Sequence, residues 1–213
     1  HSPPADLVDH ELIEQRGILT FSGSPNDDAA FDEQLRDGEK TTHPVLEISR
    51  AEAEELAPHI VFRPQDRLMW EPYAHDIDVA ATHQAFVRGF VRAGGEIHTS
   101  RRVDAARPNG DRWVIETTEG DLDADIVVNA AGAWGDVVAH AAGVDPVGLQ
   151  PLKRTAFMVS SSFANSPGFP VVAELNHAWY LRPDGAQFLC SPADETPSEP
   201  CDARADEIDI ART

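Results

Sequence analysis

Segment 124–142 constrains the fold more than any other part of this chain. Residues 124–129 (ADIVVN) form an apolar run without polar alternation, which predicts a strand buried on both faces. The small residues Ala130-Ala131-Gly132 follow, and a helix is expected from about Trp134 to Ala142. This βα unit allows its backbone to approach a bound anion at the start of the helix. Spacing alone explains the small residues equally well by tight packing between strand and helix.

The chain carries three further helix patterns. A helix is predicted over Asp27–Glu39, and Ser49 with Glu52 forms a capping-box signature that starts a short helix ending before Pro58. After Asp78, a good N-cap residue, a helix is expected from Val79 to Ala93. Apolar residues and one histidine recur there at spacings of three and four, which predicts an inner face made of Val79, His83, Phe86, Val87, Phe90 and Val91.

Short strands with turn signals between them account for much of the rest. The central run is a β-meander whose Asn109-Gly110 pair is a strong hairpin signal, because both residues tolerate positive φ. Residues 191–204 are Pro-rich and acidic, and are expected to form a surface loop or linker. The expected strands are 16–21, 45–48, 96–99, 101–107, 112–118, 155–160, 178–181 and 187–190. The pattern as a whole predicts an α/β (α+β) fold with a mixed, largely antiparallel sheet.

Composition excludes several classes of protein and partner. The 213 residues include 17 Lys+Arg against 37 Asp+Glu, for a net charge of −20. So acidic a chain repels phosphate backbones, which argues against nucleic acid as a partner. No apolar run approaches the ~20 residues of a spanning helix. The two cysteines, Cys190 and Cys201, are expected to be free thiols in a reducing compartment, which predicts a cytoplasmic location.

Three kinds of site are unsupported by motif. The cluster His75-Asp76-x-Asp78 with His83 is better explained by helix-start chemistry than by a metal, so we expect no metal site. No Gly-x-Ser-x-Gly elbow is present to support a serine hydrolase. The Gly-x-Gly-x-x-Gly fingerprint is absent as well, so spacing alone does not predict a complete dinucleotide-binding protein.

Several segments together resemble one family. Residues 126–134 (IVVNAAGAW) closely resemble a signature of FAD-dependent enzymes of the D-amino-acid oxidase superfamily. The likeness covers about residues 16–211. The pieces that point to the D-arginine/D-amino-acid dehydrogenase branch are 75–79 with 83–89, 148–157, 180–184 and 191–193.

The resemblance implies a cofactor, a reaction and site residues. The cofactor is FAD, and the reaction is oxidative deamination of a D-amino acid by hydride transfer to flavin, catalysed by a dehydrogenase or oxidase of amino-acid catabolism. Arg154 is expected to bind the substrate carboxylate through two parallel hydrogen bonds, and Tyr180 to help hold it. The backbone of Val103 is expected to contact the adenine side of FAD. Ala131, Gly132 and Trp134 are expected to line the cofactor.

The substrate side chain is the finer expectation. Arg16 falls approximately where the arginine-preferring branch has a carboxylate for a cationic side chain. A cation there would repel D-arginine, which favours a neutral or acidic D-amino acid. The alignment also allows Glu11 or Glu14 to be the carboxylate that binds a cationic side chain. The sequence does not identify the electron acceptor.

The resemblance also implies a domain organisation. Residues 1–100 and 151–213 are expected to be two parts of a substrate-binding domain, and 101–150 the middle of a Rossmann-like FAD-binding domain. The chain is expected to be an internal fragment that alone holds FAD weakly or not at all and is inactive. Two alternatives stay open: a sarcosine/glycine-oxidase-like or glycerol-3-phosphate-dehydrogenase-like flavoenzyme, and a non-catalytic acidic binding domain.

Overall fold

The computed structural model describes residue 8 and residues 10–176, 178–205 and 207–212. These residues form two compact units. Unit 1 comprises residues 1–89, 154–194 and 204–213, and unit 2 comprises residues 90–153 and 195–203. The fold is α/β, with mostly antiparallel sheets and few helices, as the sequence predicted.

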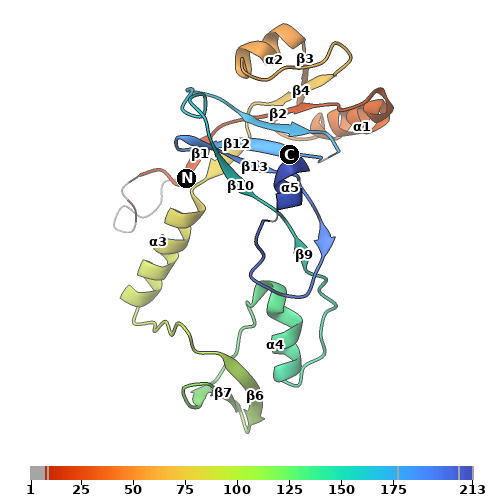
Figure 1. The fold of residues 1–213 in the computed structure, drawn as a ribbon. Helices are drawn as coiled ribbons and strands as arrows, with labels where there is room; N and C mark the ends of the chain where they lie inside the picture. The colour runs from red at the N-terminus through yellow and green to blue at the C-terminus, as the bar shows by residue number, and fades with distance from the viewer. Residues whose placement is uncertain (1–7, 9, 177, 206, 213) are drawn as a thin grey trace. The chain divides into compact units, whose positions relative to one another are not determined.

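A seven-stranded sheet forms the centre of unit 1, in the order β10-β13-β12-β11-β2-β4-β3 (Figure 1). The β11–β2 pair is parallel, and the other neighbours are antiparallel. The strands are β2 (Ile18–Phe21), β3 (Leu46–Ile48), β4 (Leu68–Glu71), β10 (Phe157–Ser160), β11 (Val171–Glu174), β12 (Tyr180–Asp184) and β13 (Gln187–Ser191). A separate antiparallel pair joins β1 (Ile13–Gln15) to β5 (His75–Ile77). The short runs predicted around residues 16–21, 45–48, 155–160, 178–181 and 187–190 are therefore strands.

The sheet of unit 1 is buried on both faces around its middle strands. Leu68 and Met69 are neighbours on β4, so their side chains point to opposite faces, and both are buried. Leu68 belongs to the main core cluster with Leu19 and Val172. Met69 packs on the other side with Phe31 of helix α1 (Asp28–Gly38). Helix α1 thus covers the second face.

Two predicted helices have the expected boundaries and caps. Helix α2 (Arg50–Leu56) carries the full capping box: Glu52 N–H donates to Ser49 Oγ (3.3 Å), and Ser49 N–H donates to Glu52 Oε2 (2.7 Å). Helix α3 (Val79–Arg92) begins directly after Asp78, whose carboxylate accepts from Ala81 N–H at 2.8 Å. That hydrogen bond lowers the pKa of Asp78 below its ordinary value. The short helix α5 (Glu207–Arg212) was not predicted.

The inner face predicted for α3 is not covered by described residues. Phe86 is 77% exposed and Val79 70% exposed, and His83 is exposed as well. Ala85 is the residue of α3 that is buried. The periodicity therefore predicted the helix correctly but not its packing, because periodicity shows which face is apolar and not what lies against it.

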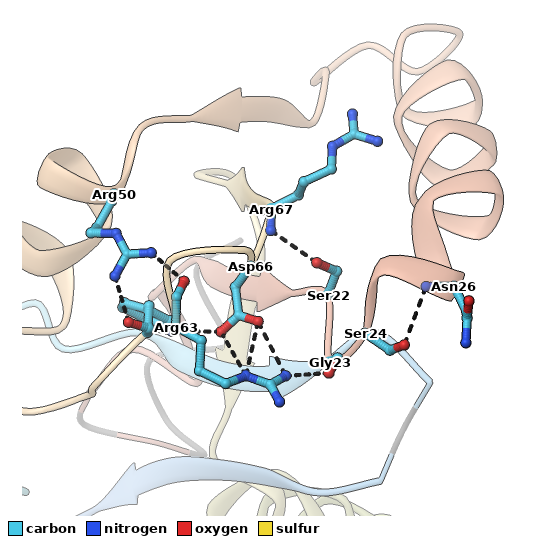
Figure 2. Close-up of polar contacts among 9 residues, drawn as sticks. Ser22, Gly23, Ser24, Asn26, Arg50, Arg63, Asp66 and Arg67 are labelled. Carbon is cyan, nitrogen blue, oxygen red and sulfur yellow. Dashed lines mark hydrogen bonds and ion pairs between the residues drawn. The ribbon is translucent and has the colours of Figure 1, made fainter.

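A polar loop between α2 and β4 is fixed by side chains that bond to backbone (Figure 2). Arg63 N–H donates to Asp66 Oδ2 (2.8 Å), and the Arg63 guanidinium donates to Asp66 and to the Gly23 carbonyl. Arg67 N–H donates to Ser22 Oγ at 2.9 Å. The loop is thereby attached to the end of β2, and Asp66 acts as a structural carboxylate.

Unit 2 contains the predicted meander. Strands β6 (Val103–Asn109), β7 (Arg112–Thr117) and β8 (Leu122–Ala124) form an antiparallel sheet in which Asn109 pairs with Arg112. The hairpin loop is therefore Gly110-Asp111, one residue later than the predicted turn. The 3-10 helix η2 (Gly132–Trp134) and helix α4 (Gly135–Ala141) follow. Strand β14 (Thr196–Pro197) lies inside the stretch 191–204 that was predicted to be a loop, and it pairs with β9 (Leu152–Lys153).

Two strand predictions in unit 2 are wrong. Residues 96–99 are not a strand, and residues 126–129 pair with no strand among the described parts of the chain. Ile126 and Val128 are each 79% exposed instead of buried. A parallel strand buried on both faces needs neighbouring strands and covering layers, and no described residue supplies them. The turn and the helix that follow this run nevertheless form as predicted.

Candidate active site

Strand β12 presents a polar face. Alternate residues point to the same side of a strand, so Tyr180, Arg182 and Asp184 share one face, and Leu181 lies on the other, packed against the core. The candidate substrate residue Tyr180 is half-buried. Two of these three residues, Arg182 and Asp184, line a cleft of about 500 Å³ within unit 1.

The remaining wall of this cleft comes from the segments around β1 and β5. Its lining is rich in carboxylates: Glu11, Glu14, Asp76, Asp78 and Asp184 face one arginine and one histidine, Arg182 and His10. The cleft is therefore acidic overall. Glu11 and Glu14 both line this cleft, and they are the two glutamates that the sequence suggested for binding a cationic substrate side chain.

Arg16 belongs to an ion-pair network beside this cleft, in which Asp76 lies between Arg16 and Arg182, and Glu14 and Asp184 pair with the two arginines at 3.5 and 3.7 Å. Arg16 Nε donates to Asp76 Oδ2 at 3.0 Å, and Arg182 Nη1 donates to Asp76 Oδ1 at 2.5 Å. The three side chains are partly buried, at 18% exposed for Arg16, 21% for Asp76 and 27% for Arg182. Arg16 Nη1 also donates to the Phe169 carbonyl at 3.4 Å. The carboxylate between two guanidiniums joins the start of β2, strand β5 and β12.

Tyr180 and the neighbour of Arg154 both contact the segment 191–194, which comprises the end of β13 and the turn after it. Tyr180 is paired with Ser191, the last residue of β13. Arg154 precedes Thr155, whose N–H donates to Asp194 Oδ1 (2.5 Å) and whose Oγ1 donates to Asp194 Oδ2 (3.1 Å). Asp194 follows Ser191 by three residues. The end of β13 therefore links the exposed Arg154 to Tyr180 within unit 1.

The predicted cofactor residues all lie in unit 2. Ala131, Gly132 and Trp134 form the turn and 3-10 helix before α4, and α4 packs against β6, which Val103 begins. Asn129 braces the turn, because its side chain donates to the Gly135 carbonyl (2.8 Å) and accepts from Ala131 N–H (3.3 Å).

This turn has an open backbone at Gly132. Gly132 has φ +55, and an added Cβ there would meet nothing within 4 Å, so its backbone is open to a ligand. A cavity of about 340 Å³ lies against residues 129–132 and the start of α4. Asp136, on the same helix, accepts three backbone N–H groups from residues 147–149 at 2.8–3.1 Å and fixes the far wall.

Sequence reasoning missed several residues that organise these regions. Asp76 was considered as part of a metal cluster and of the resemblance segment 75–79, without a structural role. Its pairing with Arg16 joins positions 60 residues apart, which no local pattern reveals. Asp194 and Thr155 are 39 residues apart. The available signal was Ser191-Pro192-Ala193, which the family resemblance included without a role.

The described part of the chain also bears on metal, membrane and thiol sites. No group of three or more His, Cys, Asp or Glu there is placed to hold a metal ion. No described helix is both long and apolar enough to cross a membrane. Cys190 and Cys201 are free, as predicted, and burial raises the pKa of the Cys190 thiol.

Comparison with known proteins gives a family. The family model described as FAD dependent oxidoreductase (DAO) matches residues 6–212. Among curated proteins, the mitochondrial dimethylglycine dehydrogenase of Mus musculus is 28% identical over 129 residues, which are 58% of this chain and 15% of that protein.

Solved structures share the fold. L-proline dehydrogenase from P. horikoshii matches with a TM-score of 0.79 and 19% identity over 94% of this chain and 54% of its own length. Glycine oxidase from Geobacillus kaustophilus matches with a TM-score of 0.77 and 19% identity, over 94% and 53%. The chain thus spans about half the length of these enzymes.

Proposed function

This chain belongs to the FAD-dependent oxidoreductase family, and on that premise we propose that it serves the oxidative deamination of a D-amino acid to a 2-oxo acid and ammonia. One observation carries the assignment of the substrate site. Tyr180 pairs with Ser191, and Thr155, next to Arg154, is bonded to Asp194 at the same strand end. Two side chains able to bind one carboxylate thus depend on one structural element.

Arg154 and Tyr180 have complementary roles in this proposal. The planar guanidinium of Arg154 binds the α-carboxylate through two parallel hydrogen bonds, which fixes both position and orientation. The Tyr180 phenol donates a further hydrogen bond without adding charge. Holding the carboxylate in this way restricts the α-carbon to one reactive arrangement, which is how proximity lowers a barrier.

FAD, when bound, supplies the redox chemistry by accepting the hydride from the α-carbon. We propose that the turn residues Ala131, Gly132 and Trp134 and the backbone of Val103 hold it, and that unit 2 is the flavin-binding part. Unit 1 then holds the substrate. The resulting imino acid is hydrolysed by water to the 2-oxo acid and ammonia, so the chain needs no strong acid or base of its own.

Two features of the chain give opposite predictions for the charge of the substrate side chain. Arg16 predicts a neutral or acidic side chain, but its charge is balanced by Asp76 at 3.0 Å. Glu11 and Glu14 line the acidic cleft and predict a cationic side chain. A panel of D-glutamate, D-alanine and D-arginine distinguishes them, because preference for D-arginine assigns the side-chain site to the glutamates.

The relatives support a second candidate, the oxidation of glycine or an N-methylated glycine. Dimethylglycine dehydrogenase and glycine oxidase are among the proteins that this chain resembles. Both candidates use an arginine for the carboxylate, so glycine and N,N-dimethylglycine are included in the substrate panel. Turnover of these two compounds alone would replace the D-amino acid in the proposal.

The test uses the full-length product of the gene that encodes this chain, purified and assayed for 2-oxo acid and ammonia. With N,N-dimethylglycine, whose tertiary amine cannot release ammonia, the aldehyde product is measured instead. Arg154→Met is expected to lower kcat/KM by about 10²-fold, because it removes charge-assisted hydrogen bonds worth about 1.5–3 kcal/mol each. Arg36→Met is the matched control, since Arg36 is exposed on α1. Equal activity in the Arg154 variant and the control would refute the assignment of Arg154.

A further inference from the structure

The turn that follows β13 is unusually constrained. Ser191 is fully buried, and Ala193 is buried with a φ of +50. The left-handed conformation costs a non-glycine residue roughly 1–2 kcal/mol, and it persists where the surroundings fix it. Here Ala193 N–H donates to Ser191 Oγ at 3.0 Å, which closes the turn on itself.

The constrained turn directs one carboxylate at one residue. Asp194 accepts both the backbone N–H and the hydroxyl of Thr155, at 2.5 and 3.1 Å. Thr155 is only 2% exposed, so both bonds lie away from water. Hydrogen bonds to an ionised acceptor are about twice as strong as neutral ones, and a buried donor without a partner costs about 1–3 kcal/mol. The Thr155 hydroxyl also donates to Asp209 Oδ2 at 3.3 Å. Asp194 therefore holds the backbone N–H of Thr155, and shares the hydroxyl with Asp209.

Arg154 lies one peptide bond before this anchored residue. A fixed backbone at Thr155 sets the position from which the Arg154 side chain extends, so substrate binding has to restrict only the side-chain rotamers of Arg154 and not its main chain as well. Resting on the proposed function of Arg154, we propose that Asp194 is a positioning residue: through Thr155 it holds the backbone from which Arg154 grips the substrate carboxylate. The left-handed conformation of Ala193 then helps to orient the Asp194 carboxylate toward Thr155.

Asparagine offers a rescue that separates geometry from charge. Its amide oxygen accepts the Thr155 N–H, and its NH₂ donates to the Thr155 hydroxyl, so Asp194→Asn keeps both contacts. Asp194→Ala removes both. Thr155→Val removes the hydroxyl contacts to Asp194 and Asp209 but keeps the backbone contact to Asp194, and it serves where the alanine variant does not fold. Asp66→Ala is the matched control, because it also removes a carboxylate that accepts a backbone N–H, from Arg63 at 2.8 Å in a loop.

The experiment measures binding of benzoate, a simple unreactive carboxylate, by calorimetry on the full-length gene product, together with flavin content and Tm. We expect Asp194→Ala to raise the benzoate Kd at least about 10-fold and Thr155→Val to raise it less. Asp194→Asn is expected to stay within about 3-fold of wild type, because both contacts persist. Asp66→Ala is expected to lower Tm without changing the Kd.

The outcomes separate this proposal from the proposed function. If Arg154→Met weakens benzoate binding but Asp194→Ala and Thr155→Val do not, the positioning role is overturned and the function of Arg154 stands. If Arg154→Met has no effect, or the wild type binds no benzoate, the function of Arg154 is overturned and the positioning role with it. An Asp194→Asn variant as weak as Asp194→Ala would overturn the geometric account.

Discussion

Gly17→Ala tests the packing that supports the candidate site. Gly17 lies between Arg16 and β2 at a φ of +79, with its N–H bonded to the Ala74 carbonyl at 3.0 Å. An added Cβ would lie 1.9 Å from Cη2 of Trp70, whose ring packs against the main core cluster. The ring would have to move by about 1.5 Å to reach ordinary contact.

The expected cost has two parts. The left-handed conformation costs alanine about 1–2 kcal/mol, and overpacking against the ring adds about 1–3 kcal/mol. The sum, about 2–5 kcal/mol, corresponds to a fall in Tm of about 4–20 °C for a protein of roughly this size. Thermal denaturation followed by circular dichroism measures it.

Gly185→Ala is the control, because Gly185 also has positive φ (+58) but its added Cβ would meet nothing within 4 Å. It is expected to cost only the conformational part. In a Trp70→Leu background, Gly17→Ala should cost no more than Gly185→Ala, since the ring is gone. Equal costs for Gly17→Ala and Gly185→Ala in the presence of Trp70 would refute the reasoning.

Two further predictions concern charges. Asp76→Asn leaves Arg16 and Arg182 without their shared carboxylate, so we expect the unfolding free energy to fall by about 1–3 kcal/mol. Urea denaturation measures this loss, and an unchanged urea midpoint would contradict the network. Hydrogen bonds from Ser49 hold the pKa of Glu52 below its ordinary value of 4.5. The ionised Glu52 carboxylate thus stabilises the fold above pH 4.5, and this stabilisation is lost as pH falls through the lowered pKa of the folded state. The difference in Tm between wild type and Glu52→Ala should therefore narrow on acidification. A difference that stays constant with pH would refute this.

Local signals in the sequence predicted most of the secondary structure. The capping box at Ser49 and the N-cap at Asp78 predicted two helix starts correctly, because capping depends on residues within one turn. The run 126–129 was predicted wrongly for the opposite reason. Apolar composition marks a segment that can be buried, but burial requires partner strands, and these are not among its described neighbours.

The candidate site was predictable only in part. The family resemblance supplied Arg154 and Tyr180. The structure pairs Tyr180 with Ser191, and bonds Thr155, the neighbour of Arg154, to Asp194 three residues further on. Asp76 and Asp194 depend on contacts between distant parts of the chain, which periodicity and spacing do not carry. The positive φ of Ala193 was also invisible, since alanine gives no local signal for the left-handed conformation.

Anaerobic mixing of the full-length gene product with single amino acids tests the central claim most directly. The claim is that this chain supplies the substrate site of an FAD-dependent amino-acid oxidoreductase. We predict a protein that purifies with flavin, whose visible absorbance is bleached by at least one D-amino acid and not by its L-enantiomer, and is bleached far more slowly in the Arg154→Met variant. A colourless protein, or a flavin that no amino acid reduces, would contradict the account.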